Sequence, residues 1–175
     1  MIRRTTYTSD GYPISAQGPA GAAGRHCFYA VKTSQQTSFT NDVWTKITGW
    51  TEQEDTETAF ASDTWTAPAD GVIEVLANIA VRAVGDNATF AWGVAINGTV
   101  SSTCIFAEAT HNGFSQTCSG SCRIEVSAND TIELHAIWTN QGSSSIVGAF
   151  GAGIWTNPTP DITAISTWKI SFWAN

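Results

Sequence analysis

Apolar and polar side chains alternate along several stretches of the chain with a period of two residues, which is the period of a β-strand. In residues 71–83, GVIEVLANIAVRA, every second side chain is apolar: Ile73, Val75, Ala77, Ile79 and Val81. Residues 130–139, DTIELHAIWT, repeat the alternation with Ile132, Leu134, Ala136 and Trp138. Each stretch predicts a strand that buries one face and exposes the other.

Residues 88–98, ATFAWGVAING, carry a second signal besides the alternation. Their large side chains share one parity and their small ones the other, which suggests a close neighbour on the small side. The stretch ends on Asn97-Gly98, a strong signal for a tight turn between two antiparallel strands. We therefore predict that this strand opens a hairpin.

The closing stretch, residues 166–175, is apolar on both parities. Its bulky side chains are Trp168, Ile170 and Phe172 on one parity and Trp173 on the other. A lone sandwich of sheets would leave part of such a strand exposed. We therefore predict that these four residues form the interface of a homotrimer.

No stretch shows an amphipathic helix with caps, and clusters of Gly, Asn, Ser and Pro separate the predicted strands at short intervals. This pattern predicts an all-β fold, an antiparallel β-sandwich. The 175 residues, 42% of them hydrophobic, are enough for one main domain with its own core.

Charge narrows the range of partners. The net charge of −7 makes the molecule repel phosphate backbones and anionic membranes, so we expect neither nucleic acid nor membrane as a partner. We also expect no signal peptide and no membrane span, because no long apolar window occurs.

The sequence contains none of the common catalytic motifs that we searched for. The chain lacks a nucleophile elbow, a phosphate-binding glycine loop and a His-Glu-x-x-His metal motif. Its histidines, His26, His111 and His135, are isolated, and each is expected to face solvent or to bond locally. We predict that the protein is not an enzyme and uses no cofactor.

The cysteines leave two alternatives open. They are Cys27, Cys104, Cys118 and Cys122. Without a secretion signal the expectation is free, partly buried thiols; the alternative is a disulfide from Cys104 to Cys118 or Cys122. The same region with His111 could supply three sulfurs and one nitrogen to a metal, but its spacing matches none of the compact zinc patterns.

An acidic run lies in residues 51–60, TEQEDTETAF. Its carboxylates are Glu52, Glu54, Asp55 and Glu57. Such a run could bind a cation, but a solvated acidic loop is the favoured interpretation.

The order of several segments resembles a known family. CFYAVKT, VWTKI, DTWTAPADGVIEV, VAINGT, ANDTIELHAIW and TWKISFW follow a stretch with glycine at every third position. This order is similar to that of complement component 1q-like globular heads, which belong to the tumour necrosis factor-like jelly rolls. The most specific piece is Trp65-Thr66-Ala67-Pro68 with Gly71, which resembles the family's turn into a long strand.

The resemblance covers residues 26–175 and is remote. Ile73 and Val75 stand where the family usually has aromatic residues, and Asn129 replaces a usual glycine. No calcium-site residue can be carried over. The resemblance implies a jelly roll of ten strands that assembles as a compact trimer.

Residues 1–25 are predicted to form an N-terminal arm and residues 26–175 the head. Gly18, Gly21 and Gly24 follow a collagen-like spacing, but these few triplets cannot form a triple helix alone. A plain Gly/Ala/Pro linker is the favoured interpretation, and a short triple-helical collar held together by a trimeric head is the alternative.

Basic residues concentrate in the arm. Arg3, Arg4 and Arg25 are three of the eight basic residues of the chain. An arm of this charge suits an acidic protein surface, so we predict that it anchors the protein to a larger assembly, with these arginines and the three arm glycines as the anchor. The alternative is that the head makes the anchoring contact itself.

Two classes of function remain. The first is a structural protein of a bacteriophage particle, a knob on the virion surface attached to the major capsid or tail protein. The second is a binding module for a glycan or a protein, for which the loop of residues 146–163, with Trp155 and Asn157, is the best candidate. The favoured interpretation of this segment is structural, a Gly-rich strand end followed by a loop braced by proline. The first class rests partly on analogy of fold.

Overall fold

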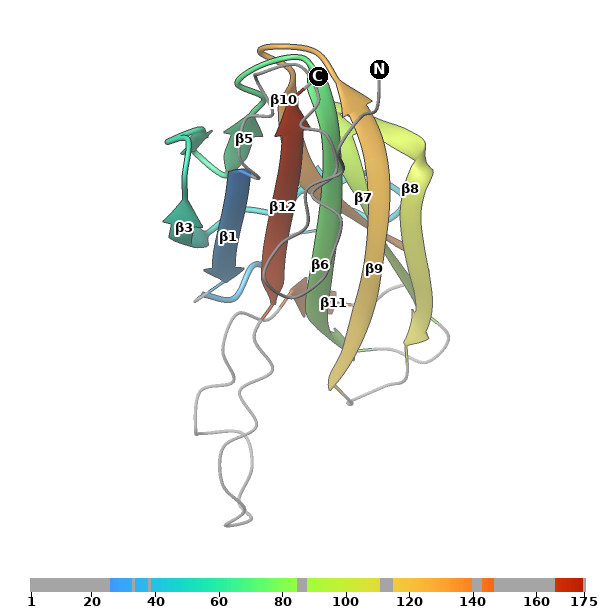
Figure 1. The fold of residues 1–175 in the computed structure, drawn as a ribbon. Coiled ribbons are helices and arrows are strands. Elements are labelled where there is room, and N and C mark those ends of the chain that lie inside the picture. Colours follow the sequence, from blue (N-terminus) through green and yellow to red (C-terminus); the bar gives the residue numbers. More distant parts are fainter. Residues whose placement is uncertain are drawn as a thin grey trace, which may run out of the picture.

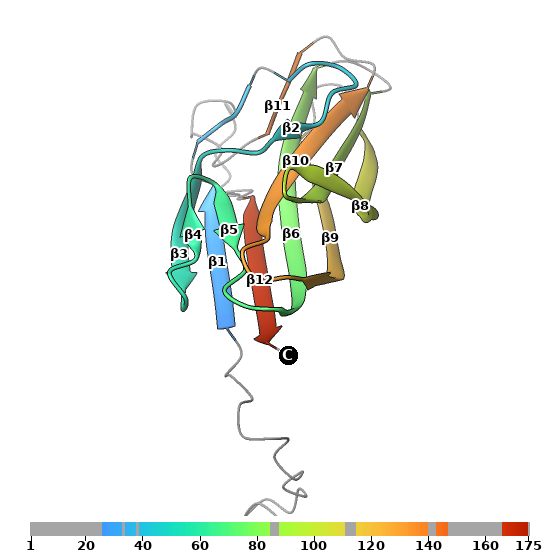
Figure 2. The same cartoon turned by 90° about the horizontal axis from the view of Figure 1, so that it is seen from above.

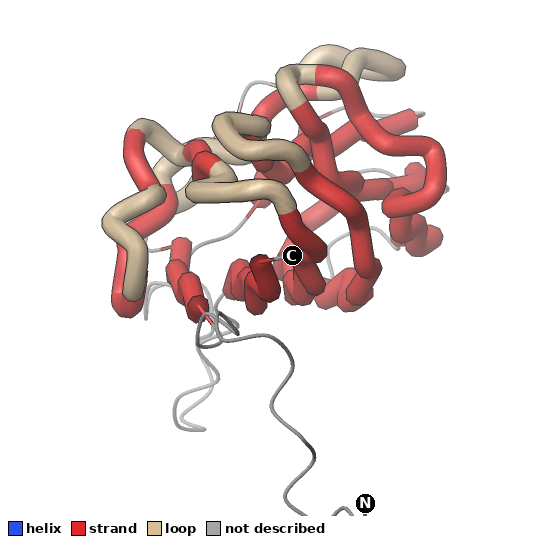
Figure 3. The backbone as a smooth tube through the Cα atoms, turned by 45° about the horizontal axis from the view of Figure 1, so that its top comes forward, coloured by secondary structure: helices blue, strands red, loops and turns tan. Residues whose placement is uncertain are grey.

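The computed structural model describes residues 26–32, 34–37, 39–84, 88–110, 115–139, 143–146 and 166–174. These residues form twelve β-strands and no helix (Figure 3). The described part of the chain therefore offers no helical segment long and apolar enough to span a membrane. The predicted all-β class is confirmed.

The strands form two antiparallel sheets, which we call sheet I and sheet II. Sheet I contains β1 His26–Lys32, β3 Trp50–Asp55, β6 Gly71–Val84, β9 Ser115–Val126, β11 Ser143–Ile146 and β12 Thr167–Ala174. Sheet II contains β2 Thr45–Lys46, β4 Phe60–Ala61, β5 Thr64–Thr66, β7 Ala88–Ile96, β8 Thr99–Thr110 and β10 Thr131–Thr139. The resemblance implied ten strands, and the described residues have twelve, of which β2 and β4 are two residues long.

Strands distant in the sequence lie side by side in both sheets. In sheet I the order is β9, β6, β12, β1, β3, so the first and last described strands are neighbours (Figure 1). In sheet II the order is β4, β5, β10, β7, β8. The two sheets stack face to face as two layers (Figure 2), which is the predicted sandwich.

The alternation read from the sequence sets which side chains enter the space between the sheets. On β6 the five apolar side chains of one parity are at most 1% exposed: Ile73, Val75, Ala77, Ile79 and Val81. On β10 the same holds for Ile132, Leu134, Ala136 and Trp138, all of which are completely buried. Burying each large side chain of this kind contributes roughly 1.5–3 kcal/mol, so the alternation is the main determinant of the fold.

Aromatic side chains fill much of the core. The Trp168 ring packs edge-on against Phe28, with 4.9 Å between ring centroids, and Phe90 packs against Trp138 at 4.7 Å. These contacts join β12 to β1 and β7 to β10.

The predicted hairpin turn between β7 and β8 is confirmed. Asn97 and Gly98 both have positive φ, 51° and 77°, as the tight turn requires. The close neighbour expected beside the small face of β7 is β8, since a Cβ built on Gly93 would lie 2.9 Å from the Val100 side chain.

Candidate functional site

The closing strand β12 turns its two faces to different surroundings. Trp168, Ile170 and Phe172 point into the core and are at most 1% exposed within a single chain. A second subunit cannot reach them while the sandwich is intact, so their assignment to a trimer interface needs correction: they fill the core of one chain. Trp173 lies half-buried on the outer face of sheet I and stays a predicted contact.

Four apolar or aromatic side chains lie on the outer face of sheet I, with Glu74, Ser171 and Lys169 between them, and we call these four the face patch. It consists of Tyr29, Val72, Leu76 and Trp173. Leu76 is 40% exposed and is in register with Lys169 of β12. Two cations cover its aromatic rings: Lys169 Nζ lies 4.8 Å from the Tyr29 centroid, and the Arg123 guanidinium carbon lies 5.8 Å from that of Trp173.

The edge strand β8 of sheet II carries the second exposed apolar site. Ile105 is 42% exposed and pairs with Gly93 of β7. After this pair the register shifts, because the next partners are Ala95 and Val100. Ser101 to Cys104 therefore form a bulge with no partner in the β7 ladder.

A disulfide joins this bulge to the other sheet. Cys104 of β8 is bonded to Cys122 of β9, with Cα atoms 5.7 Å apart. β8 and β9 are the edge strands on the same side of the sandwich, so the bond closes that side covalently (Figure 1). The expectation of free thiols is thus wrong for these two residues, and Cys122 rather than Cys118 is the partner. Cys27 and Cys118 are outside the disulfide.

Two residues after Cys104, the aromatic ring of Phe106 fills the gap between β8 and β9. The Phe106 ring of β8 stacks on Trp92 with 4.6 Å between centroids. A Cβ built on Gly120 of β9 would lie only 2.3 Å from this ring, so glycine is what allows the two edges to approach.

A polar cluster crosses the outer face of sheet II. Glu133 of β10 accepts hydrogen bonds from Lys46 Nζ at 2.8 Å and from the Thr64 hydroxyl at 3.0 Å, and it lies 2.9 Å from His135 Nε2. Burial raises the pKa of Glu133, but the hydrogen bonds from His135, Lys46 and Thr64 outweigh it and hold the pKa at about 2. His135 is thus locally bonded, and the cluster ties β2 and β5 to β10.

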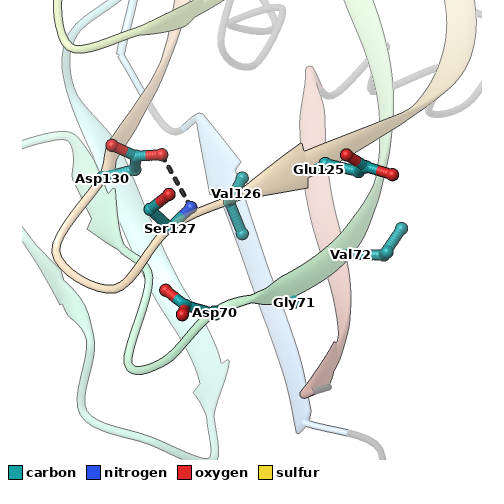
Figure 4. A pocket seen from close by; sticks show the side chains of 7 residues that line it. All are labelled: Asp70, Gly71, Val72, Glu125, Val126, Ser127 and Asp130. Carbon is teal, nitrogen blue, oxygen red and sulfur yellow. Dashed lines mark hydrogen bonds between the residues drawn. The ribbon is translucent and has the colours of Figure 1, made fainter.

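One hollow of about 330 Å³ opens where β6 begins and β9 ends (Figure 4). Its carboxylates are Asp70, Glu125 and Asp130. Asp70 accepts the Ala128 N–H and Asp130 the Ser127 N–H, both at 2.8 Å, so two of the three hold the turn after β9. Among the described residues no group of three or more His, Cys, Asp or Glu side chains is placed to hold a metal ion.

The acidic run around Glu52 is a strand and not the predicted loop. It forms most of β3, and Thr51 to Glu54 are all exposed, as expected for a solvated segment. Sequence reasoning therefore identified its exposure but not its conformation.

Several predicted site residues lie outside the described residues. They are the anchor residues Arg3, Arg4, Gly18, Gly21, Gly24 and Arg25, the loop residues Trp155 and Asn157, and His111. Sequence reasoning also missed Leu76 and Ile105. The signal for Leu76 was present: it is an apolar residue on the polar parity of β6.

Comparison with solved structures places the fold. The globular domain of zebrafish complement 1qA matches with a TM-score of 0.54 and 12% identity, over 85% of this chain and 96% of that chain. The Eiger TNF from S. frugiperda matches with a TM-score of 0.60 and 11% identity, over 86% and 94%. Murine APRIL at pH 5.0 matches with a TM-score of 0.56 and 8% identity, over 85% and 98%.

These likenesses define the class of fold: the chain is an antiparallel jelly roll of the complement 1q and tumour necrosis factor type. No protein-family model matches the sequence, and no curated protein matches it significantly. The identities are low, so the likeness lies in the fold.

Proposed function

We propose that the chain is a non-enzymatic structural module that assembles as a homotrimer and displays its head on the surface of a viral particle. The trimer is supported by two of the three exposed large apolar side chains of the described residues, Leu76 in the face patch and Ile105 on the β8 edge. They lie on different sheets, so one can meet the other in a head-to-tail contact that closes into a ring.

The charges around the face patch suit a buried contact. Lys169 and Arg123 lie over aromatic rings, so each positive charge keeps a partner if the contact between subunits excludes water from it. The complement 1q and tumour necrosis factor type of fold supports the same assembly by analogy.

Light scattering of the full chain tests the trimer. The native protein is expected to have three times the chain mass, and Leu76→Asp and Ile105→Asp should each give folded monomers because a carboxylate would be buried in the contact. Val43→Asp is the matched control, since Val43 is also large, apolar and 50% exposed but lies in neither site. A native protein that stays monomeric at micromolar concentration contradicts the proposal.

The anchoring role is assigned to residues 1–25. This segment holds Arg3, Arg4 and Arg25 but only one acidic residue, Asp10, whereas the head carries the remaining fourteen of the fifteen acidic residues. A basic arm is attracted to an acidic capsid or tail protein. The acidic head is repelled by the same protein, and this repulsion is weakest when the head points away from it into solvent.

A binding assay with particles that lack the protein tests the anchor. The full chain is expected to attach, and a chain in which Arg3, Arg4 and Arg25 are replaced by Glu is not. Replacing the three by Lys is the control, because it keeps the charge. Equal attachment of all three proteins would move the anchor to the head.

A further inference from the structure

The β8 bulge, residues Ser101 to Cys104, is held in place by few interactions. It has no ladder partner in β7, and its side chains Ser101 and Thr103 bond mainly to each other, 3.0 Å apart. The bulge is attached to the rest of the molecule by Cys104, whose side chain is buried in the core and bonded to Cys122 on the other sheet.

The bulge ends at Ile105, one of the two exposed apolar sites of the proposed subunit contact. Cys104 is 1% exposed and points inward, and the next side chain, Ile105, points outward. Ile105 itself is held by its pairing with Gly93, so what the disulfide fixes is the bulge beside Ile105 and with it the shape of the edge around this side chain.

We infer that the Cys104–Cys122 disulfide is a redox lock on assembly: its formation fixes the β8 edge in the shape that a second subunit binds, and its reduction weakens the trimer. This inference rests on the proposed trimer and names how that contact is regulated. A reducing cytoplasm would keep newly made chains weakly associated, and an oxidising exterior would lock the assembled form.

The chemistry is a thiol–disulfide exchange. A dithiol donates two electrons and two protons, the bond between the two sulfurs breaks, Cys104 and Cys122 become thiols, and the dithiol becomes its own disulfide. The fold itself should survive, because β8 from Ile105 onward stays in the β7 ladder and Phe106 stays stacked on Trp92.

The test measures trimer dissociation on dilution for the full chain, oxidised or treated with dithiothreitol. Alkylation of the denatured chain with mass detection reports the redox state, two reactive thiols when oxidised and four when reduced. Cys122→Ser imitates the reduced state without reductant. Cys118→Ser is the matched control, because Cys118 is on the same strand and buried but outside the disulfide.

The oxidised native chain and Cys118→Ser are expected to stay trimeric at concentrations where the reduced chain and Cys122→Ser dissociate, with the midpoint raised roughly tenfold or more. Hydrogen exchange should quicken on reduction in the bulge, residues 101–104, and not in β6. A trimer of equal strength in both redox states overturns the lock and leaves the proposed trimer standing. A chain that is monomeric when oxidised overturns both.

Discussion

The two sides of the sandwich end in edge strands that are protected in different ways (Figure 1). On one side β3 is exposed from Thr51 to Glu54, carries carboxylates, and has a bulge at Gln53 where its register with β1 shifts. On the other side β8 and β9 are tied by a disulfide and carry the apolar Ile105.

This difference indicates which side is suited to solvent and which to contact with another protein surface. Charges and a bulge keep an edge strand from pairing with other chains, so the β3 side is built to remain in solvent. An apolar side chain on a covalently fixed edge does the opposite, because it offers a rigid surface whose burial is favourable. The predictions below separate these two kinds of edge, from the largest effect to the smallest.

Removing the disulfide should have the largest effect on stability. The bond closes a loop with a sequence separation of 18 residues, for which the loss of unfolded-state entropy is worth roughly 3 kcal/mol. For a chain of this length that corresponds to a melting temperature lower by roughly 6–12 °C. Calorimetry of the oxidised chain and of Cys104→Ser with Cys122→Ser measures it; an unchanged melting temperature contradicts the covalent role.

A larger side chain at position 120 should lower the free energy of unfolding somewhat less than loss of the disulfide does. The added side chain in Gly120→Val would meet the Phe106 ring and push it off Trp92, with an expected loss of about 2 kcal/mol in the free energy of unfolding. Ser121→Val on the same strand is the control, since Ser121 is exposed. Urea denaturation compares the two, and equal midpoints would mean that the ring can move aside freely.

Acid should remove the contribution of the polar cluster on sheet II. The pKa of Glu133 is about 2 in the folded chain against 4.5 as the ordinary value, so its stabilisation is complete above pH 4.5 and is lost as pH falls toward 2. Glu133→Gln should therefore cost roughly 1–2 kcal/mol at pH 7 and less at pH 3. Urea midpoints at both values check this; a difference that does not shrink in acid rejects the assignment.

The alternation of apolar and polar residues predicted the core strands because an inward side chain is buried whichever strand its own strand pairs with. It could not decide which parity of the closing strand faces the core, because both are apolar, and therefore the interface prediction included Trp168, Ile170 and Phe172, which the core buries. Pairing between residues far apart in sequence, as for Cys104 and Cys122, depends on sheet order, which no local pattern contains.

Buried polar groups were equally hard to predict. Lys32 is 1% exposed, although lysine in a strand usually faces solvent. Its Nζ donates to the Thr48 carbonyl, and burial lowers the pKa of this amine while the nearby Asp63 raises it. Thr48 lies between β2 and β3 and Asp63 between β4 and β5, so the meeting of these two segments at Lys32 becomes visible only in three dimensions.

Substitutions at the β3 edge should have the smallest effect on stability. Their effect on association between molecules should be clear. Glu52→Thr with Glu54→Thr removes two exposed carboxylates and should alter the free energy of unfolding by less than about 0.5 kcal/mol. Without these charges the edge can pair with that of another molecule, so sedimentation at high concentration should show species larger than the native assembly. Replacing the same two residues by Lys is the control, because it keeps the edge charged and should keep the native mass. If the threonine variant also keeps the native mass, the bulge at Gln53 protects this edge without help from the carboxylates.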